Sequence, residues 1–347
     1  MIEVGLIGFG LAGRVFHAPM ISAVEGMRLA AILQRQGDEA VEAYPASRVV
    51  RSLTELLAMD SIRLVVIATP NSSHFELARA CLLAGRDVVI DKPFATTYAE
   101  AAELASLAAS HKRLLSVYQN RRWDGDFQTL RGLLAEGAFG RVVTFESHFD
   151  RFRPHLKQNA WRERNEAGSG LLFDLGPHLI DQTLVLFGEP AAICADIRIE
   201  RDGSVVNDAF DVVLRYPSMR ALLRAGVLIT TPTPRYAIHG TEGGYLKYGL
   251  DPQEDALKRG ERPSAPGWGQ ESSEHWGTLW RVQGDGLSDE KWPTLPGDYR
   301  RYYANVRDAM LGAAPLDVTP EQALRVMRVL ELARESSQRR HTLPWNA

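Results

Sequence analysis

The chain has 347 residues, more than one hydrophobic core usually supports, so two domains are expected. Hydrophobic residues make up 45% and charged residues 24% of the sequence, and the formal net charge is -3. This balance is typical of a folded globular protein and argues against disorder. It gives no support to a nucleic-acid partner, for which a basic surface would be expected.

The cysteines and the amino terminus indicate the compartment. Cys81 and Cys194 are the 2 cysteines of the sequence, and each lies in an apolar segment, which argues against a disulfide framework and favours a reducing compartment. No basic region precedes the first apolar run, residues 4–13 are too glycine-rich for a signal peptide, and no apolar stretch reaches the ~18 residues of a membrane span. We expect a cytoplasmic protein without a membrane partner.

The first 120 residues alternate short apolar runs with helical patterns. Strands are predicted at 2–7, 29–33, 64–68, 88–90 and 114–117, and helices at 53–59, 74–84 and 98–110. Short buried strands that alternate with helices indicate a parallel sheet with helices on both faces. We therefore predict a Rossmann dinucleotide-binding domain over residues 1–120.

The pattern changes in residues 121–347, where strands follow one another with short turns. Helices are predicted at 127–136, 175–186, 299–311 and 320–335, and strands at 142–148, 192–199, 209–216, 221–230 and 235–240. The fold class is therefore α/β, with a C-terminal α/β substrate-binding domain built on a large, mostly antiparallel open sheet. For the closing helices, within 299–335, packing against the first domain is an alternative to packing within the second. A sheet face without helices favours oligomerisation, and a homodimer is expected.

Residues 250–297 show no periodicity and are rich in Gly, Pro, Trp and charge. A long segment without regular structure inside a domain is usually functional or mobile. We expect it to cover the substrate or to form a subunit contact, as its tryptophans at 268, 276, 280 and 292 suggest.

A glycine-rich motif directly follows the first predicted strand. It consists of Gly8, Phe9, Gly10, Leu11, Ala12 and Gly13. Such glycines allow a tight turn and the close approach of a pyrophosphate, and the following helix offers free N–H groups. The alternative is a glycine-rich turn without a ligand. Pro19 is expected to kink or end the helix that follows.

The residues that follow the predicted strand 29–33 are expected to determine whether NAD or NADP binds. Gln34-Arg35 stand there, followed by Gly37-Asp38. An arginine at this place pairs with the extra phosphate of NADP, whereas an acidic residue binds the ribose of NAD. We expect NADP through Arg35, and the alternative is NAD with Asp38 on the ribose.

Two further patterns carry possible acid–base chemistry. Lys92, in Asp91-Lys92-Pro93, follows a predicted strand and lies at the carboxyl edge of the sheet, although a solvated surface lysine is the alternative. Asp174 and His178 are four residues apart and share a face if they lie on one helix. The alternatives are an Asp N-cap followed by a core histidine, or a metal site, which lacks a third ligand and is not expected.

A group of amide and arginine side chains lies at the junction of the predicted domains, in residues 118–123. Gln119, Asn120 and Arg122 suit a hydroxylated or acidic ligand, and packing between the domains is the alternative.

With these motifs, the sequence resembles the Gfo/Idh/MocA oxidoreductase family over nearly its whole length. The matching residues are the loop 8–13, Ala68-Thr69-Pro70-Asn71 with His74, Asp91-Lys92-Pro93, Asp174 with His178, and Gly240-Thr241-Glu242-Gly243-Gly244. Phe16-His17-Ala18-Pro19 and Asn120-Arg121-Arg122-Trp123 are similar to the branch that contains NADP-using scyllo-inositol dehydrogenases. Asp91 is a departure, because the family more often has glutamate there.

The resemblance implies a nicotinamide-dependent dehydrogenase of a sugar or cyclic polyol, with Lys92, Asp174 and His178 acting together. Cofactor contacts are expected from the loop 8–13 and from Gln34, Arg35, Thr69, Pro70, Asn71, His74, Asp91, Lys92 and Gln119. Substrate contacts are expected from Asn120, Arg122, Trp161, Arg162 and Tyr236.

The chemistry supports these roles independently of the resemblance. A histidine is a natural general base for the hydroxyl proton, and a lysine stabilises the developing alkoxide. Asp174 either orients His178 or binds a substrate hydroxyl. Two other functions stay open: a catalytically silent dinucleotide sensor, and a glycosidase that uses a bound nicotinamide transiently.

Overall fold

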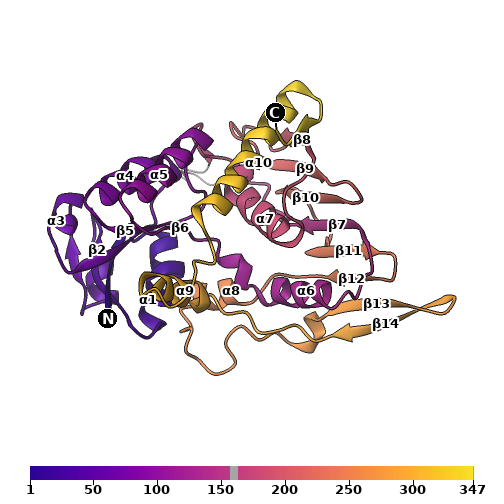
Figure 1. Cartoon of the computed structure of the whole chain (residues 1–347), viewed down its shortest axis with the longest axis horizontal. Helices are drawn as coiled ribbons and strands as arrows, with labels where there is room; N and C mark the ends of the chain where they lie inside the picture. The colour runs from indigo at the N-terminus through magenta and orange to yellow at the C-terminus, as the bar shows by residue number, and fades with distance from the viewer. Residues whose placement is uncertain (157–162, 347) are drawn as a thin grey trace. The chain divides into compact units, whose positions relative to one another are not determined.

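The computed structural model describes residues 1–156 and 163–346, which form two compact units (Figure 1). Unit 1 consists of Met1–Asn120, Gln253–Trp268 and Asp298–Leu324. Unit 2 consists of Arg121–Pro252, Gly269–Gly297 and Arg325–Ala347.

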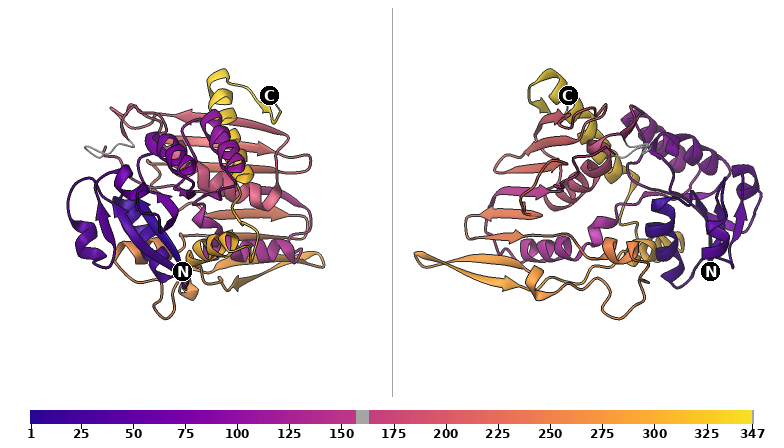
Figure 2. Two further views of the ribbon diagram at one scale, coloured as in Figure 1. Left: turned by 60° about the vertical axis from the view of Figure 1, so that its left-hand side comes forward. Right: turned by 180° about the vertical axis from the view of Figure 1, so that it is seen from behind.

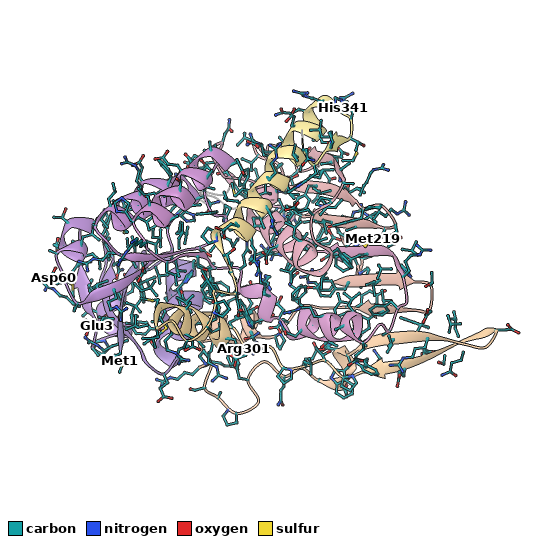
Figure 3. All side chains as sticks on the ribbon, in the orientation of Figure 1. Met1, Glu3, Asp60, Met219, Arg301 and His341 are labelled. Carbon is teal, nitrogen blue, oxygen red and sulfur yellow. The ribbon has the colours of Figure 1, made fainter. Side chains whose placement is uncertain are left out.

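Unit 1 is built on a six-stranded parallel sheet in the order β3-β2-β1-β4-β5-β6. Its strands are β1 (Ile2–Ile7), β2 (Met27–Leu33), β3 (Arg48–Val50), β4 (Ile62–Ile67), β5 (Asp87–Ile90) and β6 (Leu115–Val117). The central strands are almost continuously buried because helices cover both faces. This is the doubly wound order, in which ligands bind at the carboxyl ends of the strands near β1 and β4. Glu3 and Asp60 mark the opposite, amino-terminal edge (Figure 3).

The helices of unit 1 form a layer on each face of this sheet. They are η1 (Ala12–His17), α1 (Ala18–Ala23), α2 (Glu39–Ala43), α3 (Leu53–Leu57), η2 (Asn71–Ser73), α4 (His74–Leu83), α5 (Tyr98–Ser110), α8 (Gln253–Lys258) and α9 (Arg300–Met310). Helices α4 and α5 pack together on one face, and α1 and α9 pack together on the other (Figures 1 and 2). Pro19 lies in the first turn of α1, where the π-helical η1 gives way to an α-helix. The predicted Rossmann fold is confirmed.

Unit 2 is built on a nine-stranded sheet in the order β14-β13-β12-β11-β7-β10-β9-β8-β15. Its strands are β7 (Val142–His148), β8 (Ala192–Arg198), β9 (Ala209–Arg215), β10 (Arg220–Gly226), β11 (Tyr236–Gly240), β12 (Gly243–Lys247), β13 (Gly277–Gln283), β14 (Gly286–Trp292) and β15 (Leu343–Pro344). All neighbouring strands are antiparallel except β7 and β10. The predicted large, mostly antiparallel sheet is confirmed.

The helices of unit 2 lie on one face of this sheet (Figure 2). The long helices on this face are α6 (Gly125–Ala135), α7 (Leu171–Phe187) and α10 (Pro320–Arg339), the last of which begins in unit 1 (Figure 1). The short helices η3 (Asn120–Trp123) and η5 (Ser273–His275) complete the unit. Phe145 of β7 points to the helical face, where its ring centroid is 5.2 Å from that of Phe187 on α7. Cys194, Val213 and Leu222 are in register on neighbouring strands, point to the opposite face and are only half-buried.

The segment 250–297 is more regular than predicted, which corrects the interpretation as a structureless loop. It contains α8 and η5, and β13 and β14 form a hairpin at the edge of the sheet (Figure 1). Gln283 pairs with Gly286 across the two-residue turn Gly284-Asp285, where Gly284 has a φ of 58°. A two-residue turn of this type favours positive φ, so the Gly-Asp-Gly sequence is itself a hairpin signal, which the interpretation as a loop did not use.

Other elements also differ from the prediction. Strand β10 ends at Gly226 rather than at 230, because the backbone that follows it bonds to residues 151–153, for example from Ile229 N–H to the carbonyl oxygen of Arg151, instead of continuing the ladder with β9. Helix α7 begins at Leu171 rather than at 175, and β12 was not predicted.

Within the described part of the chain, no helix combines the length and the apolar character that crossing a membrane requires.

Candidate active site

The glycine-rich loop after β1 has three glycines with different structural demands. Gly8 has a φ of 95°, and a Cβ there would lie 2.6 Å from the carbonyl oxygen of Ala68. A Cβ on Gly13 would lie 2.0 Å from the carbonyl oxygen of Gly8. Gly10 has nothing within 4 Å of its virtual Cβ. Two glycines are therefore required by packing, and the third leaves the open space that a dinucleotide pyrophosphate needs beside the backbone.

The other predicted cofactor residues of unit 1 follow the carboxyl ends of its strands. They are Gln34 and Arg35 after β2, Thr69, Pro70 and Asn71 after β4, Asp91 and Lys92 after β5, and Gln119 after β6. In the loop itself, Phe9 is buried edge-on against Tyr44, with ring centroids 5.9 Å apart, whereas Leu11 is exposed. Parallel strands bring all these turns to one edge, which is where this class of sheet binds nucleotides.

The turn after β2 separates the arginine from the acidic residue. Arg51 donates to the carboxylate of Asp38 at 2.6 Å and to the carbonyl oxygens of Gln34 and Gly37 at 2.8 and 2.6 Å. Arg35 is exposed and makes no ion pair with a described residue. Asp38 therefore has a cationic partner in Arg51, whereas Arg35 is available for an anionic group.

His74 connects two turns of this edge. Its Nδ1 lies 2.9 Å from the carbonyl oxygen of Pro93, and its Nε2 lies 3.0 Å from the carbonyl oxygen of Thr69. The side chain is fully buried, and burial lowers the pKa of His74. His74 thus fixes the two turns that flank the predicted cofactor position, and the geometry favours this supporting role over a direct contact.

Asp91 is held beside Lys92 by several groups. Its Oδ1 accepts a hydrogen bond of 2.9 Å from the backbone N–H of Lys92 and lies 3.7 Å from Nε2 of His17. Burial would raise the pKa of Asp91, but the nearby imidazole of His17, with help from Lys92 and His74, outweighs it, so that the pKa is lowered. The carboxylate next to Lys92 is therefore ionised at neutral pH.

Helix α7 places Asp174 and His178 on one face. The helix begins after Gly170, which has a φ of 88°, and the side-chain oxygen of Asn207 accepts from the second backbone N–H of the helix at 2.8 Å. It continues without interruption through Pro177. Asp174 lies inside the helix, so the alternative of an Asp N-cap is wrong. Asp174 is half-buried and His178 is buried.

The same face of α7 continues into a buried polar network. Arg122 binds the carboxylate of Asp181 with two hydrogen bonds of 2.8 and 2.6 Å. Gln182 Oε1 accepts from the hydroxyl of Tyr236 at 2.9 Å and from Arg235 at 2.7 Å. Arg122 and Tyr236 were predicted to contact substrate. Their partners within unit 2 favour a supporting role, in which they hold the helix that carries His178.

The remaining predicted substrate residues divide into two groups. Asn120 is buried at the end of the first segment of unit 1. Trp161 and Arg162 lie outside the described residues. Two residues that the sequence analysis missed, Asp181 and Gln182, could have been found, because they continue the spacing of Asp174 and His178 along an otherwise apolar helix.

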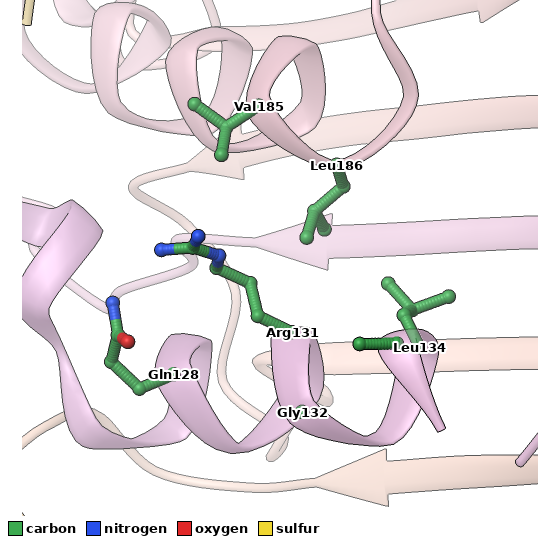
Figure 4. Close-up of a pocket in the computed structure, with 7 residues that line it drawn as sticks. Gln128, Arg131, Gly132, Leu134, Val185 and Leu186 are labelled. Atoms are coloured by element: carbon green, nitrogen blue, oxygen red, sulfur yellow. The ribbon is translucent and has the colours of Figure 1, made fainter. Parts of the chain in front are cut away.

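A groove of about 550 Å³ lies between α6 and α7 (Figure 4). Its lining residues are Gln128, Arg131, Gly132, Leu134, Ala135, Val185 and Leu186. Val185 comes about two helical turns after His178, so the groove is at the other end of α7 and includes none of the predicted site residues. In the described ranges there is also no cluster of three or more His, Cys, Asp or Glu side chains that could hold a metal ion.

The strand order, the open position at Gly10 and the lysine turn at the carboxyl edge define unit 1 as the nucleotide-binding half of a nicotinamide-dependent oxidoreductase. The description "Oxidoreductase family, NAD-binding Rossmann fold" matches residues 2–119, and "Oxidoreductase family, C-terminal alpha/beta domain" matches residues 131–345. The chain belongs to the Gfo/Idh/MocA oxidoreductase family. The predicted family is confirmed, as is the prediction of an NAD(P)-dependent dehydrogenase.

Relatives are similar over the full length. The chain is 46% identical to the uncharacterized oxidoreductase YdgJ of Escherichia coli K12, over 99% of this chain and 98% of YdgJ. It is 37% identical to IolW of Bacillus subtilis, named scyllo-inositol 2-dehydrogenase (NADP(+)), over 99% of this chain and 95% of IolW. Among solved structures, yvaA of Bacillus subtilis, described as an oxidoreductase, superimposes with a TM-score of 0.96 at 37% identity, covering 99% of this chain and 98% of yvaA.

Proposed function

We propose that the chain reversibly oxidises a secondary hydroxyl of a sugar or an inositol-like cyclic polyol, with hydride transfer to NADP. The observation that carries this proposal is the pair Asp174 and His178 on one face of α7, anchored by a buried network. A carboxylate and a histidine on one helix face can serve proton transfer when the helix that carries them is held in place. The name of IolW, a scyllo-inositol 2-dehydrogenase, supports the substrate class.

Each of the three proposed catalytic residues has a distinct task. His178 accepts the proton of the substrate hydroxyl as general base. Lys92 stabilises the negative charge that develops on the same oxygen. Asp174 either orients His178 or binds a neighbouring hydroxyl of the substrate. The nicotinamide, when bound, supplies the hydride acceptor.

The turn after β2 supports NADP over NAD. Arg35 is available to an anion, whereas Asp38 is held by Arg51. An arginine matches the planar geometry of a phosphate, and a neutralised Asp38 offers less to a ribose hydroxyl. Gln119 supports cofactor binding further, because its buried Oε1 has no hydrogen-bond partner among the described residues.

The setting completes the proposal. The two cysteines are free, which suits a reducing cytoplasm. The half-buried face of the unit 2 sheet, with Cys194, Val213 and Leu222, supports self-association, and we propose a homodimer.

The test is a screen of the purified protein against inositols, sugars and uronates, with NADP and NAD in parallel. The absorbance of the reduced cofactor reports turnover. We expect the absorbance of the reduced cofactor to rise with at least one polyol, and to rise faster with NADP than with NAD. If no compound of the panel is oxidised although the protein binds the cofactor, the proposal is contradicted and a sensor or a glycosidase is favoured. A glycoside-release assay then distinguishes these two functions.

A further inference from the structure

A set of buried polar groups in unit 1 connects to Asp91, the residue before Lys92. The proposed reaction gives these groups no role. His17, at the end of η1, is fully buried. Its Nδ1 lies 2.6 Å from the hydroxyl of Tyr303 on α9, and its Nε2 lies 3.7 Å from the carboxylate of Asp91. The imidazole ring also packs against Tyr118, with ring centroids 4.3 Å apart. A histidine therefore links a buried tyrosine to the carboxylate next to Lys92.

The protonation of Tyr303 determines which group donates in each contact between Tyr303, His17 and Asp91. Burial, with the neighbouring Tyr118, Tyr302 and Asp91, raises the pKa of Tyr303 well above its usual range. The Tyr303 hydroxyl therefore stays protonated and donates to Nδ1 of His17. An imidazole that accepts this hydrogen bond at Nδ1 carries its proton on Nε2, which lies 3.7 Å from the carboxylate of Asp91. The order is Tyr303 to His17 to Asp91, and Asp91 then accepts from the backbone N–H of Lys92.

We propose that His17 and Tyr303 are positioning residues that hold the ionised Asp91 carboxylate against the turn carrying Lys92. The imidazole tautomer is set by Tyr303, so that an N–H and not a lone pair faces the carboxylate. Lys92 is thereby kept beside a fixed negative charge. This inference rests on the proposed function, because it assumes that Lys92 takes part in the reaction.

Packing alone does not explain this arrangement. Tyr302 belongs to the same aromatic cluster, with its ring centroid 5.2 Å from that of Tyr303. Its hydroxyl donates to Ser116 at 2.8 Å, and Ser116 donates to the carbonyl oxygen of Val318 at 2.9 Å. That chain of hydrogen bonds ends on the backbone carbonyl of Val318. The two neighbouring buried tyrosines thus differ in where these hydrogen bonds lead: that of Tyr302 to Ser116, and that of Tyr303 to His17 beside Asp91.

This difference provides a matched pair of variants. Tyr303→Phe and Tyr302→Phe each remove one buried hydroxyl from the same cluster, so a similar loss of thermal stability is expected from both. We expect Tyr303→Phe to lower kcat about tenfold, with the KM for the polyol and the Kd for NADP changed by no more than about twofold. Tyr302→Phe is expected to keep kcat within about twofold of the wild type.

The pH profile supplies a readout that a purely structural defect would not move. Among the described residues, the groups that act on Asp91 include His17 from η1, His74 from α4, Tyr303 from α9 and Lys92 from its own turn. Without Tyr303 the imidazole of His17 can turn its lone pair to Asp91. Burial then raises the pKa of the carboxyl, and the acid limb of kcat moves to higher pH in Tyr303→Phe alone.

Two substitutions of His17 separate its nitrogens. Gln places its amide near the position of Nε2 and keeps a donor toward Asp91, whereas Asn places it near Nδ1 and keeps only the contact with Tyr303. His17→Gln should retain more of kcat than His17→Asn. Equal kcat and equal pH profiles for Tyr303→Phe and Tyr302→Phe, or a better rescue by Asn, would overturn the inference. If Lys92→Ala keeps full turnover, the proposed role of Lys92 fails instead, which distinguishes the two failures.

Discussion

The two units carry their candidate functional residues by different means. In unit 1 each residue follows the end of a buried strand, so the backbone of the sheet determines its position: Gly10 follows β1, Arg35 follows β2, and Lys92 follows β5. In unit 2, Asp174 and His178 lie on a single helix. That helix is held by side chains from distant parts of the chain, among them Arg122 and Arg235.

The difference shows which residues tolerate change. A turn after a strand keeps its place when its side chain is replaced, because the ladder of backbone hydrogen bonds is untouched. A polar face on a buried helix depends on each of its partners, since a buried group without a partner is costly. Substitutions of strand-end residues of unit 1 that are not buried, such as Arg35 and Lys92, should therefore alter ligand binding or chemistry with little loss of stability, whereas substitutions in the network of unit 2 should lower stability as well.

The largest effect is expected when the network of unit 2 is broken. Arg122→Ala leaves the buried carboxylate of Asp181 without its bidentate partner and should cost about 3–5 kcal/mol of unfolding free energy. Urea denaturation measures this loss. As a control, Arg122→Met combined with Asp181→Leu should recover most of the stability, because neither charge remains. If the unfolding free energy of Arg122→Ala lies within about 1 kcal/mol of that of the wild type, the network does not hold α7.

A smaller but still large effect should follow loss of the proposed catalytic side chains. Lys92→Ala and His178→Ala should each lower kcat at least about a hundredfold, with little change in the Kd for NADP. Steady-state kinetics and cofactor titration measure both quantities. His111→Ala, an exposed histidine in unit 1, is the control and should leave kcat unchanged. Wild-type turnover in either catalytic variant would remove that residue from the mechanism.

The same contrast explains how much was predictable from the sequence. The strands and glycines of unit 1 follow from short apolar runs and from the spacing of Gly8, Gly10 and Gly13, because both signals are local. The roles of Arg122 and Tyr236 were predicted less well, since their partners Asp181 and Gln182 are 59 and 54 residues away. No local pattern encodes such pairs. The link from His17 to Tyr303, 286 residues apart, was invisible for the same reason.

An intermediate effect is expected at the cofactor-specificity turn of unit 1. Arg35→Ala should weaken NADP about tenfold or more and leave NAD nearly unchanged, because one charge-assisted contact to a phosphate is lost. Fluorescence titration with each cofactor measures the two values. Arg63→Ala, which removes another exposed arginine of unit 1, should change neither. Equal weakening of NADP and NAD would contradict the assignment of Arg35 to the extra phosphate.

The smallest effect concerns the thiols, one in each unit. Burial raises the pKa of Cys81 to about 12, so its thiolate fraction near pH 8 is roughly a thousandth of that of an ordinary thiol. In the folded protein Cys81 should therefore not react with a disulfide reagent, and Cys194→Ser should abolish the reaction that remains. Cys194 is half-buried on the sheet face opposite α7. If that face mediates self-association, the rate at which Cys194 reacts with the reagent should fall as the protein concentration rises across the dimerisation range. A rate that stays constant, while sedimentation shows dimers forming over the same range, would place the subunit contact elsewhere.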